Sequence, residues 1–226
     1  MLIAGYQKSS FLDYPGLPAA VVFTPFCNMN CSYCHNSHIL SGSPRLIDES
    51  TVFEHLEKRA GTLKAVVISG GEPTLQQNLL PFIERVRQLG YRVKLDTNGM
   101  KPQVLSELLR GGLLDYVAMD IKAPQAKYEQ VTRVAVDFPA IRRSIAHLRA
   151  GDVPHEFRLT FAPELTKADV VEAALLVKGT AHFYLQQYRT RSERDPMPHP
   201  PSLVYETADA VREAIGVCGV RGLAVR

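Results

Sequence analysis

The chain of 226 residues lacks the features that would place it in a membrane or on nucleic acid. Its longest apolar runs are short, such as Ala19–Phe23, whereas a membrane-spanning helix needs about 20 apolar residues. No run of five or more Lys or Arg residues occurs, and the formal net charge is only +3. We therefore expect neither a membrane partner nor a nucleic-acid partner.

The N-terminal segment Met1–Ser10 has no basic region followed by an apolar stretch, which a secretory signal would require. This indicates a cytoplasmic, reducing location, where clustered cysteines bind metals or carry out redox chemistry more often than they form disulfides. Cysteine is scarce as well, with four in the chain. Cys218 stands alone and is expected to be a small buried residue without a chemical role.

Short β-rich runs alternate with amphipathic helical patterns along the chain. The predicted strands are Ala20–Thr24, Ala65–Ser69, Arg92–Asp96, Tyr116–Ile121, Glu156–Phe161, His182–Gln187 and Arg221–Val225. Several are rich in Val, Ile, Phe and Leu with few charges, as is typical of parallel strands covered on both faces. The alternation predicts an α/β fold of six βα units, with a parallel sheet that is either open or curled into a barrel.

The predicted helices lie between these strands. They cover about 48–60, 79–89, 104–110, 138–150 and 166–178. Asp48 is expected to cap the first of them, and Thr166 with Asp169 resembles a capping box. The Pro-rich range 192–202 is expected to be a connecting loop. We expect one domain over 1–226, with a short C-terminal extension from about residue 190.

Three cysteines, Cys27, Cys31 and Cys34, follow directly after the first predicted strand. A cubane [4Fe–4S] cluster suits such a loop, because each thiolate binds a different iron and the fourth iron stays open for a ligand. The alternative is a zinc site with His35 or His38 as the fourth ligand. In a parallel sheet the functional residues gather at the carboxyl ends of the strands, where this loop is expected.

The C-x3-C-x2-C loop resembles the signature of the radical S-adenosylmethionine (SAM) superfamily, with an aromatic residue, Tyr33, before its last cysteine. Three further marks follow in order: Gly70–Pro73, Leu95–Gly99 and Asp115–Lys122. The resemblance extends from about residue 5 to 189 and implies a partial (β/α)6 TIM-like barrel. The opening segment Gly5–Gly16 is most similar to the longer form of the activating proteins of anaerobic ribonucleoside-triphosphate reductase.

This resemblance implies an oxidoreductase with a [4Fe–4S] cluster on the three cysteines and with SAM on its open iron. Such an enzyme cleaves SAM reductively to methionine and a 5′-deoxyadenosyl radical, using an electron from flavodoxin or ferredoxin. The radical then takes a hydrogen atom from a glycine Cα of the partner reductase. The glycyl-radical partner would therefore be anaerobic ribonucleotide reductase.

The resemblance also implies residues that bind SAM. Tyr33 would pack on the adenine, and Gly70, Gly71 and Glu72 would bind the amino group. The alternative for the two glycines is a plain strand-to-helix turn, and for Tyr33 it is a surface aromatic.

A second group of residues would surround the SAM carboxylate. Similar positions to Asp96, Thr97 and Asp120 hold a monovalent cation in glycyl-radical activating enzymes, and the alternative is a simple ion pair with Lys122. Arg158 is a candidate for gripping the SAM carboxylate, or else it pairs with an acidic residue of the chain.

Gln187 and Arg189 occupy the region in which the family contacts the ribose or the adenine. The pyruvate formate-lyase type has a histidine near position 189, so the role of Arg189 is in doubt. Three other functions stay open: activation of a pyruvate formate-lyase homologue, a small-molecule reaction such as 7-carboxy-7-deazaguanine synthesis, and a zinc-binding module.

Overall fold

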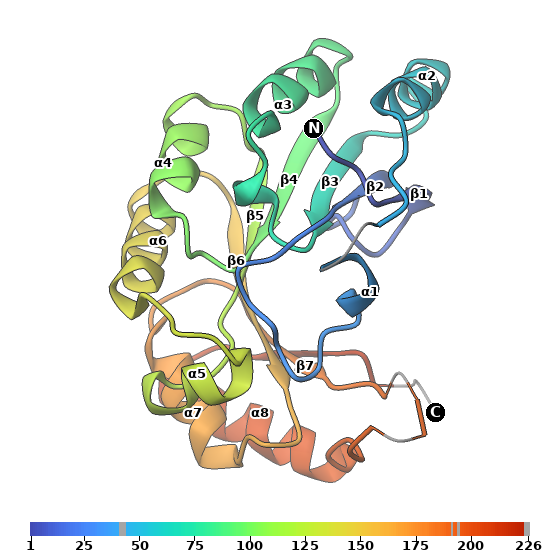
Figure 1. The fold of residues 1–226 in the computed structure, drawn as a ribbon. Helices are drawn as coiled ribbons and strands as arrows, with labels where there is room; N and C mark the ends of the chain where they lie inside the picture. The colour runs from blue at the N-terminus through green and yellow to red at the C-terminus, as the bar shows by residue number, and fades with distance from the viewer. Residues whose placement is uncertain (41–43, 191, 194, 224–226) are drawn as a thin grey trace.

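The computed structural model describes residues 1–40, 44–190, 192–193 and 195–223. Eight strands form one sheet in chain order (Figure 1). They are β1 (Gly5–Ser10), β2 (Ala19–Thr24), β3 (Ala65–Gly70), β4 (Arg92–Thr97), β5 (Tyr116–Asp120), β6 (His155–Phe161), β7 (Phe183–Gln187) and β8 (Gly219–Arg221). Strands β2 to β8 are parallel, which confirms the predicted parallel sheet of six βα units and a seventh strand.

Two strands differ from the sequence-based expectation. β1 was missed because its residues, GYQKSS, are mostly polar; it pairs antiparallel with β2, for example Tyr6 with Val22. β8 ends at Arg221 instead of beginning there, because Gly222 leaves the extended conformation with φ +84. The predicted residues 224–225 of that strand lie outside the described part of the chain.

All but the first of the helices lie along the outer side of the curved sheet, and that first, short helix lies at its open side (Figure 1). The helices are α1 (Ser37–Leu40), α2 (Glu49–Arg59), α3 (Leu79–Gln88), α4 (Pro102–Arg110), α5 (Tyr128–Thr132), α6 (Phe138–Ala150), α7 (Lys167–Leu175) and α8 (Pro201–Ile215), with 3-10 turns η1 (Pro73–Leu75) and η2 (Gln125–Lys127). The five predicted helices are present as α2, α3, α4, α6 and α7. α8 was missed, although Val204, Ala208, Val211 and Ile215 have helical spacing.

The helix starts agree only in part with the predicted caps. Thr166 and Asp169 form the expected capping box of α7. Asp48 occupies the N-cap position of α2, but within the described residues its side chain makes no capping hydrogen bond. The predicted loop over 192–202 overlaps α8, because a proline is tolerated in the first turn of a helix and Pro201 begins this one.

The sheet has two different faces. Toward the helices, alternate residues such as Ile68, Leu95 and Phe157 join the main hydrophobic core. On the inner face, Val21 and Val67 belong to a smaller apolar cluster, which lies toward the amino ends of the parallel strands. The carboxyl ends of the inner face are thus left for polar side chains. No helix in the described ranges is long and apolar enough to cross a membrane.

Candidate active site

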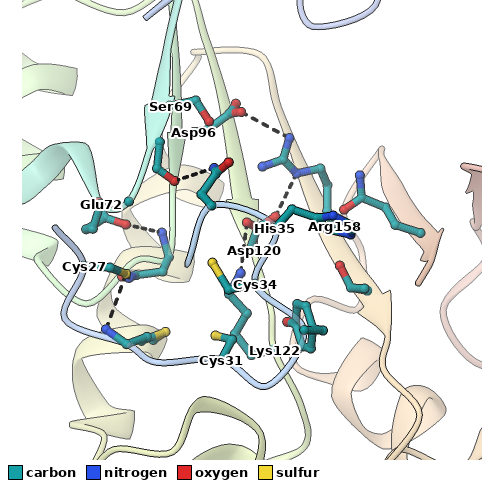
Figure 2. Close-up of a pocket in the computed structure, with 18 of the residues that line it drawn as sticks. Cys27, Cys31, Cys34, His35, Ser69, Glu72, Asp96, Asp120, Lys122 and Arg158 are labelled. Carbon is teal, nitrogen blue, oxygen red and sulfur yellow. Dashed lines mark hydrogen bonds and ion pairs between the residues drawn. The ribbon is translucent and has the colours of Figure 1, made fainter. Parts of the chain in front are cut away.

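One cavity of about 430 Å³ lies at the carboxyl ends of the parallel strands. Its lining includes every site residue that the sequence predicted: Cys27, Cys31, Tyr33, Cys34, Gly70, Gly71, Glu72, Asp96, Thr97, Asp120, Lys122, Arg158 and Gln187. Figure 2 shows the three cysteines along one loop, with Asp96, Asp120 and Arg158 on the neighbouring strands. Residues spread over 161 positions are thus gathered by the parallel sheet at a single site.

The cysteine loop is held by backbone contacts with two helical segments. The N–H of Asn30 donates to the carbonyl of Thr132 (2.9 Å), and the N–H of Ser32 donates to Val131 (3.2 Å), both at the end of α5. Near the start of the loop, the N–H of Phe26 donates to the carbonyl of Ile39 in α1 (3.1 Å). The three thiols therefore project from a backbone that is fixed at both ends.

The two glycines after β3 are required by contact with the chain itself. A Cβ on Gly70 would lie 2.2 Å from the backbone nitrogen of Thr24, and one on Gly71 would lie 1.9 Å from the carbonyl oxygen of Phe26. The N–H groups of Gly71 and Glu72 donate to Thr24 and Phe26 (both 2.8 Å). The two glycines thus approach the start of the cysteine loop closely, and their expected contact with the SAM amino group stays a prediction.

Glu72 is fully buried and receives four hydrogen bonds. Its donors are the N–H and hydroxyl of Thr74 (3.1 and 2.6 Å), the hydroxyl of Thr97 (2.7 Å) and the N–H of Asn98 (2.7 Å). Burial raises the pKa of this carboxyl, and these hydrogen bonds oppose the shift. A carboxylate accepts about four hydrogen bonds, so these four donors satisfy Glu72. Because Glu72 follows β3 while Thr97 and Asn98 lie at the end of β4, the carboxylate links the ends of the two strands. Its expected contact with the SAM amino group stays a prediction.

Asn98 is a residue of the site that the sequence analysis did not single out. Its side-chain amide donates to Asn28 Oδ1 (2.8 Å) and approaches Cys27 Sγ (3.8 Å), which also receives the N–H of Met29 at 3.4 Å. Burial raises the pKa of the Cys27 thiol to about 11, and the N–H of Met29 partly offsets this. The signal in the sequence was its place directly after β4.

Five charged side chains form a network on the inner face of β4, β5 and β6 and directly after β5, and Figure 2 labels four of them: Asp96, Asp120, Lys122 and Arg158. Arg158 contacts Asp120 at 2.8 Å and Asp96 at 3.4 Å, Lys94 contacts Asp96 at 2.7 Å, and Lys122 contacts Asp120 at 3.1 Å. Burial alone would raise the pKa of both aspartates, but Arg158 and the lysines hold the pKa of Asp96 and Asp120 below its usual value. The sequence analysis gave such ion pairs as the alternatives to a cation site at the aspartates and to a SAM carboxylate at Arg158.

The net charge of this network determines which charged group it can bind. Three cations and two carboxylates leave a formal excess of one positive charge. The aspartates are thus balanced by side chains of the chain, and the expected monovalent cation stays a prediction. Lys94 was missed, although Lys94 and Asp96 stand two apart on a strand and so share a face. The positive excess suits one additional carboxylate, as SAM carries.

Two buried polar atoms of the cavity lack a partner in the described part of the chain: the hydroxyl of Tyr33 and Oε1 of Gln187. The amide nitrogen of Gln187 donates to the carbonyl of His199 (3.0 Å), which fixes Oε1 as the free acceptor. Tyr33 is 7% exposed, and Lys122 Nζ lies 5.9 Å from its ring centroid. Since buried polar groups are normally satisfied, both atoms fit a bound molecule with hydroxyl and amino groups, such as an adenosyl group.

The donor set also fits an iron–sulfur cluster. Cys27, Cys31 and Cys34 are thiols without disulfide bonds, and all three line the cavity. Among the described residues, no three His, Cys, Asp or Glu side chains are gathered closely enough to hold a single metal ion. A cubane does not need such a group, because its thiolates bind different irons.

Two further residues of the sequence analysis have definite places. Arg189 lines the cavity and donates to the carbonyl of Gly222 through Nε (3.3 Å) and Nη2 (3.1 Å). Cys218 is 5% exposed and belongs to the main hydrophobic core, which confirms that it is buried.

Comparison with known proteins finds similarity to radical SAM proteins at the level of the family and of individual relatives. The model of the radical SAM superfamily matches residues 21–177. A protein of Methanocaldococcus jannaschii named as a glycyl-radical enzyme activating enzyme is 34% identical over 209 residues, which cover 87% of this chain and 86% of that protein. The 7-carboxy-7-deazaguanine synthase of Koribacter versatilis is 38% identical over 92 residues, 40% of this chain and 39% of the synthase.

A solved structure shows the same fold at low identity. The chain superposes on a radical SAM methyltransferase from Sphaerobacter thermophilus with a TM-score of 0.71 and 17% identity, over 94% of this chain and 68% of that one. The likeness extends over most of the chain and shows a shared fold.

Proposed function

The chain belongs to the radical SAM superfamily, and on this premise we propose that it is the activating enzyme of a glycyl-radical enzyme. The observation that carries the proposal is its 34% identity to the M. jannaschii protein so named, over 87% of the chain. The similarity to the deazaguanine synthase spans only 40% of the chain. Within this class we propose anaerobic ribonucleotide reductase as the partner, in the cytoplasm, with flavodoxin or ferredoxin as electron donor.

Family membership implies a [4Fe–4S] cluster and SAM. Cys27, Cys31 and Cys34 would hold the cluster, which together with SAM supplies a 5′-deoxyadenosyl radical by one-electron reductive cleavage. The backbone N–H of Met29 and the side-chain amide of Asn98 donate toward Cys27 Sγ and favour its thiolate form.

The other lining residues bind and orient SAM. The cationic excess of the charge network attracts its carboxylate, while Gln187 Oε1 accepts a hydrogen bond from the ribose or the adenine amino group. Tyr33 packs on the adenine. Hydrogen-atom removal needs no general acid or base, so the chain has to hold the reacting groups together and exclude water.

A peptide glycine suits the open shape of the sheet. In the described residues the edge strands β1 and β8 do not pair with each other, so the sheet does not close into a full barrel. A loop of a partner protein can enter at this open side. A glycine Cα radical is stabilised by delocalisation into both neighbouring amides, and the missing side chain lets that backbone lie flat.

The test is to mix the reduced enzyme, SAM and an anaerobic ribonucleotide reductase without oxygen. We expect a glycyl-radical EPR doublet on the reductase that depends on SAM and on the three cysteines. A radical on pyruvate formate-lyase instead would keep the activating function and change the partner. If SAM is consumed without a radical on any such partner, while a pterin speeds turnover, the small-molecule reaction replaces this proposal.

A further inference from the structure

An ion pair between a buried carboxylate and a partly exposed guanidinium joins the inner face of β6 to the edge strand β8. Glu156 is 1% exposed, and its two carboxylate oxygens contact Nη1 (2.6 Å) and Nη2 (2.9 Å) of Arg221. The hydroxyl of Tyr116 donates to the same carboxylate (3.1 Å). This two-pronged geometry fixes the plane of the guanidinium.

An aromatic ring holds Arg221 from a second side. The guanidinium carbon lies 3.4 Å from the ring centroid of Tyr184 on β7. That ring also packs on Gly219, where a Cβ would come within 2.6 Å of it, so the glycine makes room for the stacked pair. Arg221 is therefore positioned in advance, at little further cost in conformational entropy on binding.

Stability alone does not explain this arrangement. An ion pair of this kind contributes little net stability, because the hydration that the buried carboxylate and the partly buried guanidinium lose offsets much of their attraction. Yet Arg221 also lines the cavity that contains the cysteines, and its side chain is 36% exposed. A guanidinium has five N–H donors, and Glu156 takes two of them, so three remain for another molecule.

Arg221 lies nearer the open edge of the sheet than the cysteines and the charge network, with Gln187 on the adjacent strand β7. The cysteines follow β2 and the charge network lies on β4 to β6, whereas Arg221 is on β8 at the open edge of the sheet. Arg189 lies beside it, bound to the neutral carbonyl of Gly222 and not paired with any carboxylate of the described residues. This edge therefore presents oriented donors at the side where a partner can enter.

We propose that Arg221, held by Glu156 and Tyr184, is a positioning residue for the substrate and donates to a backbone carbonyl of the partner segment that carries the target glycine. This inference rests on the proposed function. A backbone carbonyl is favoured over a charged group because Glu156 already neutralises Arg221. By holding the peptide beside the glycine, Arg221 would align the Cα–H with the radical.

The test compares variants that keep the ion pair balanced. Arg221→Lys retains the charge but loses the planar fork, and the double variant Glu156→Gln/Arg221→Gln leaves no buried charge unpaired. The matched control is Arg85→Gln, since Arg85 also stacks on a ring (3.6 Å from the centroid of Phe53) and faces a carboxylate (Glu49, 3.8 Å), but lies outside the cavity.

Two rates are measured for each variant: radical formation against partner concentration, and SAM cleavage by dithionite-reduced enzyme without partner. We expect the KM for the partner to rise about tenfold, the loss of roughly one hydrogen bond of 1.4 kcal/mol. Cleavage without partner should stay near the wild-type rate, and Arg85→Gln should change neither.

Three results would overturn the inference. An unchanged KM in both Arg221 variants shows that the residue does not contact the partner. An equal fall in partner-free SAM cleavage assigns Arg221 to the SAM site or to the fold. A wild-type enzyme that forms no radical on any glycyl-radical partner, but consumes SAM with a small molecule, overturns the proposed function and this inference together.

Discussion

Phe157 and Arg158 are neighbours on β6 and lie on opposite faces of the same sheet. Phe157 is fully buried against the helices, whereas Arg158 faces the cavity and joins two aspartates. The helix-facing side is apolar along β3 to β7, while the inner side bears Lys94, Asp96 and Asp120. Because side chains alternate along each strand, one face of the sheet carries the residues of the hydrophobic core and the other carries the charged residues of the cavity.

The difference has a physical basis. Apolar burial on the outer face stabilises the fold by roughly 25 cal/mol per Å² of area removed from water. Charges on the inner face lose hydration, and their mutual attraction only about offsets that loss. Substitutions on the outer face should therefore change the free energy of unfolding, and those on the inner face should change ligand binding.

The largest difference between variants is expected when the three cysteines that line the cavity are compared with Cys218 in the hydrophobic core. Replacing Cys27, Cys31 or Cys34 by Ala should abolish the cluster and SAM cleavage, because each thiolate holds one iron. Cys218→Ala, in the helix-facing core, should leave both intact. Anaerobic purification with iron and sulfide analysis should find about one [4Fe–4S] cluster per wild-type chain. Stoichiometric zinc, or loss of the cluster in Cys218→Ala, would contradict this assignment.

Phe157→Ala should lower the free energy of unfolding by about 3–5 kcal/mol, because it opens a cavity in the core. Denaturant unfolding measures this loss. SAM cleavage per mole of bound cluster should stay close to wild type, since the side chain points away from the cavity. If that specific activity falls with stability, the two faces are not as separate as the structure indicates.

Asp96→Asn and Asp120→Asn should weaken SAM binding by about tenfold, roughly 1.4 kcal/mol, without changing cluster content. Each substitution increases the positive excess of the network, but both acids orient Arg158 and the lysines beside the expected SAM carboxylate, and we expect the loss of that orientation to outweigh the added attraction. Asp115→Asn is the matched control, because Asp115 pairs with Arg87 (2.6 Å) outside the cavity. Unchanged SAM affinity in both inner-face variants would show that the ion pairs are purely structural.

The smallest change in the free energy of unfolding is expected for a substitution at the N-terminus of α7. Asp169 receives bonds from Thr166 and Lys127, and these hold its pKa below the usual value although burial acts in the opposite direction. Asp169→Asn should cost about 1 kcal/mol of stability at neutral pH and leave SAM affinity unchanged.

The pH dependence of unfolding checks the sign of this effect. A carboxyl whose pKa is lowered on folding stabilises the native state above its unfolded pKa of 3.8, and that contribution is lost as the pH falls through the native pKa. The difference between wild type and Asp169→Asn should therefore shrink on acidification below about pH 4. A difference that is constant with pH would assign the effect to side-chain shape instead.

The comparison of faces also refines the interpretation of the strands. The apolar content of several strands predicted parallel strands covered on both faces, and β2 and β3 carry apolar side chains on both. In β4 to β6 the inner face is covered as well, with Lys94 and Glu156 buried, but it bears charged residues at alternate positions: Lys94, Asp96, Asp120, Glu156 and Arg158. Alternation within these strands was the available signal, and it was masked by the apolar residues between the charges.

The sequence by itself determined the order of strands and helices, the cysteine loop and the residues that follow each strand. These depend on local periodicity and on the rule that parallel strands end at one edge, so residues such as Cys27 and Gln187 could be assigned to one site. Tertiary structure alone decided the partners of those residues. Gly70 and Gly71 are needed because Thr24 and Phe26 lie against them, and Glu156 meets Arg221 across 65 positions. Such contacts depend on the register and curvature of the whole sheet, which local periodicity does not encode.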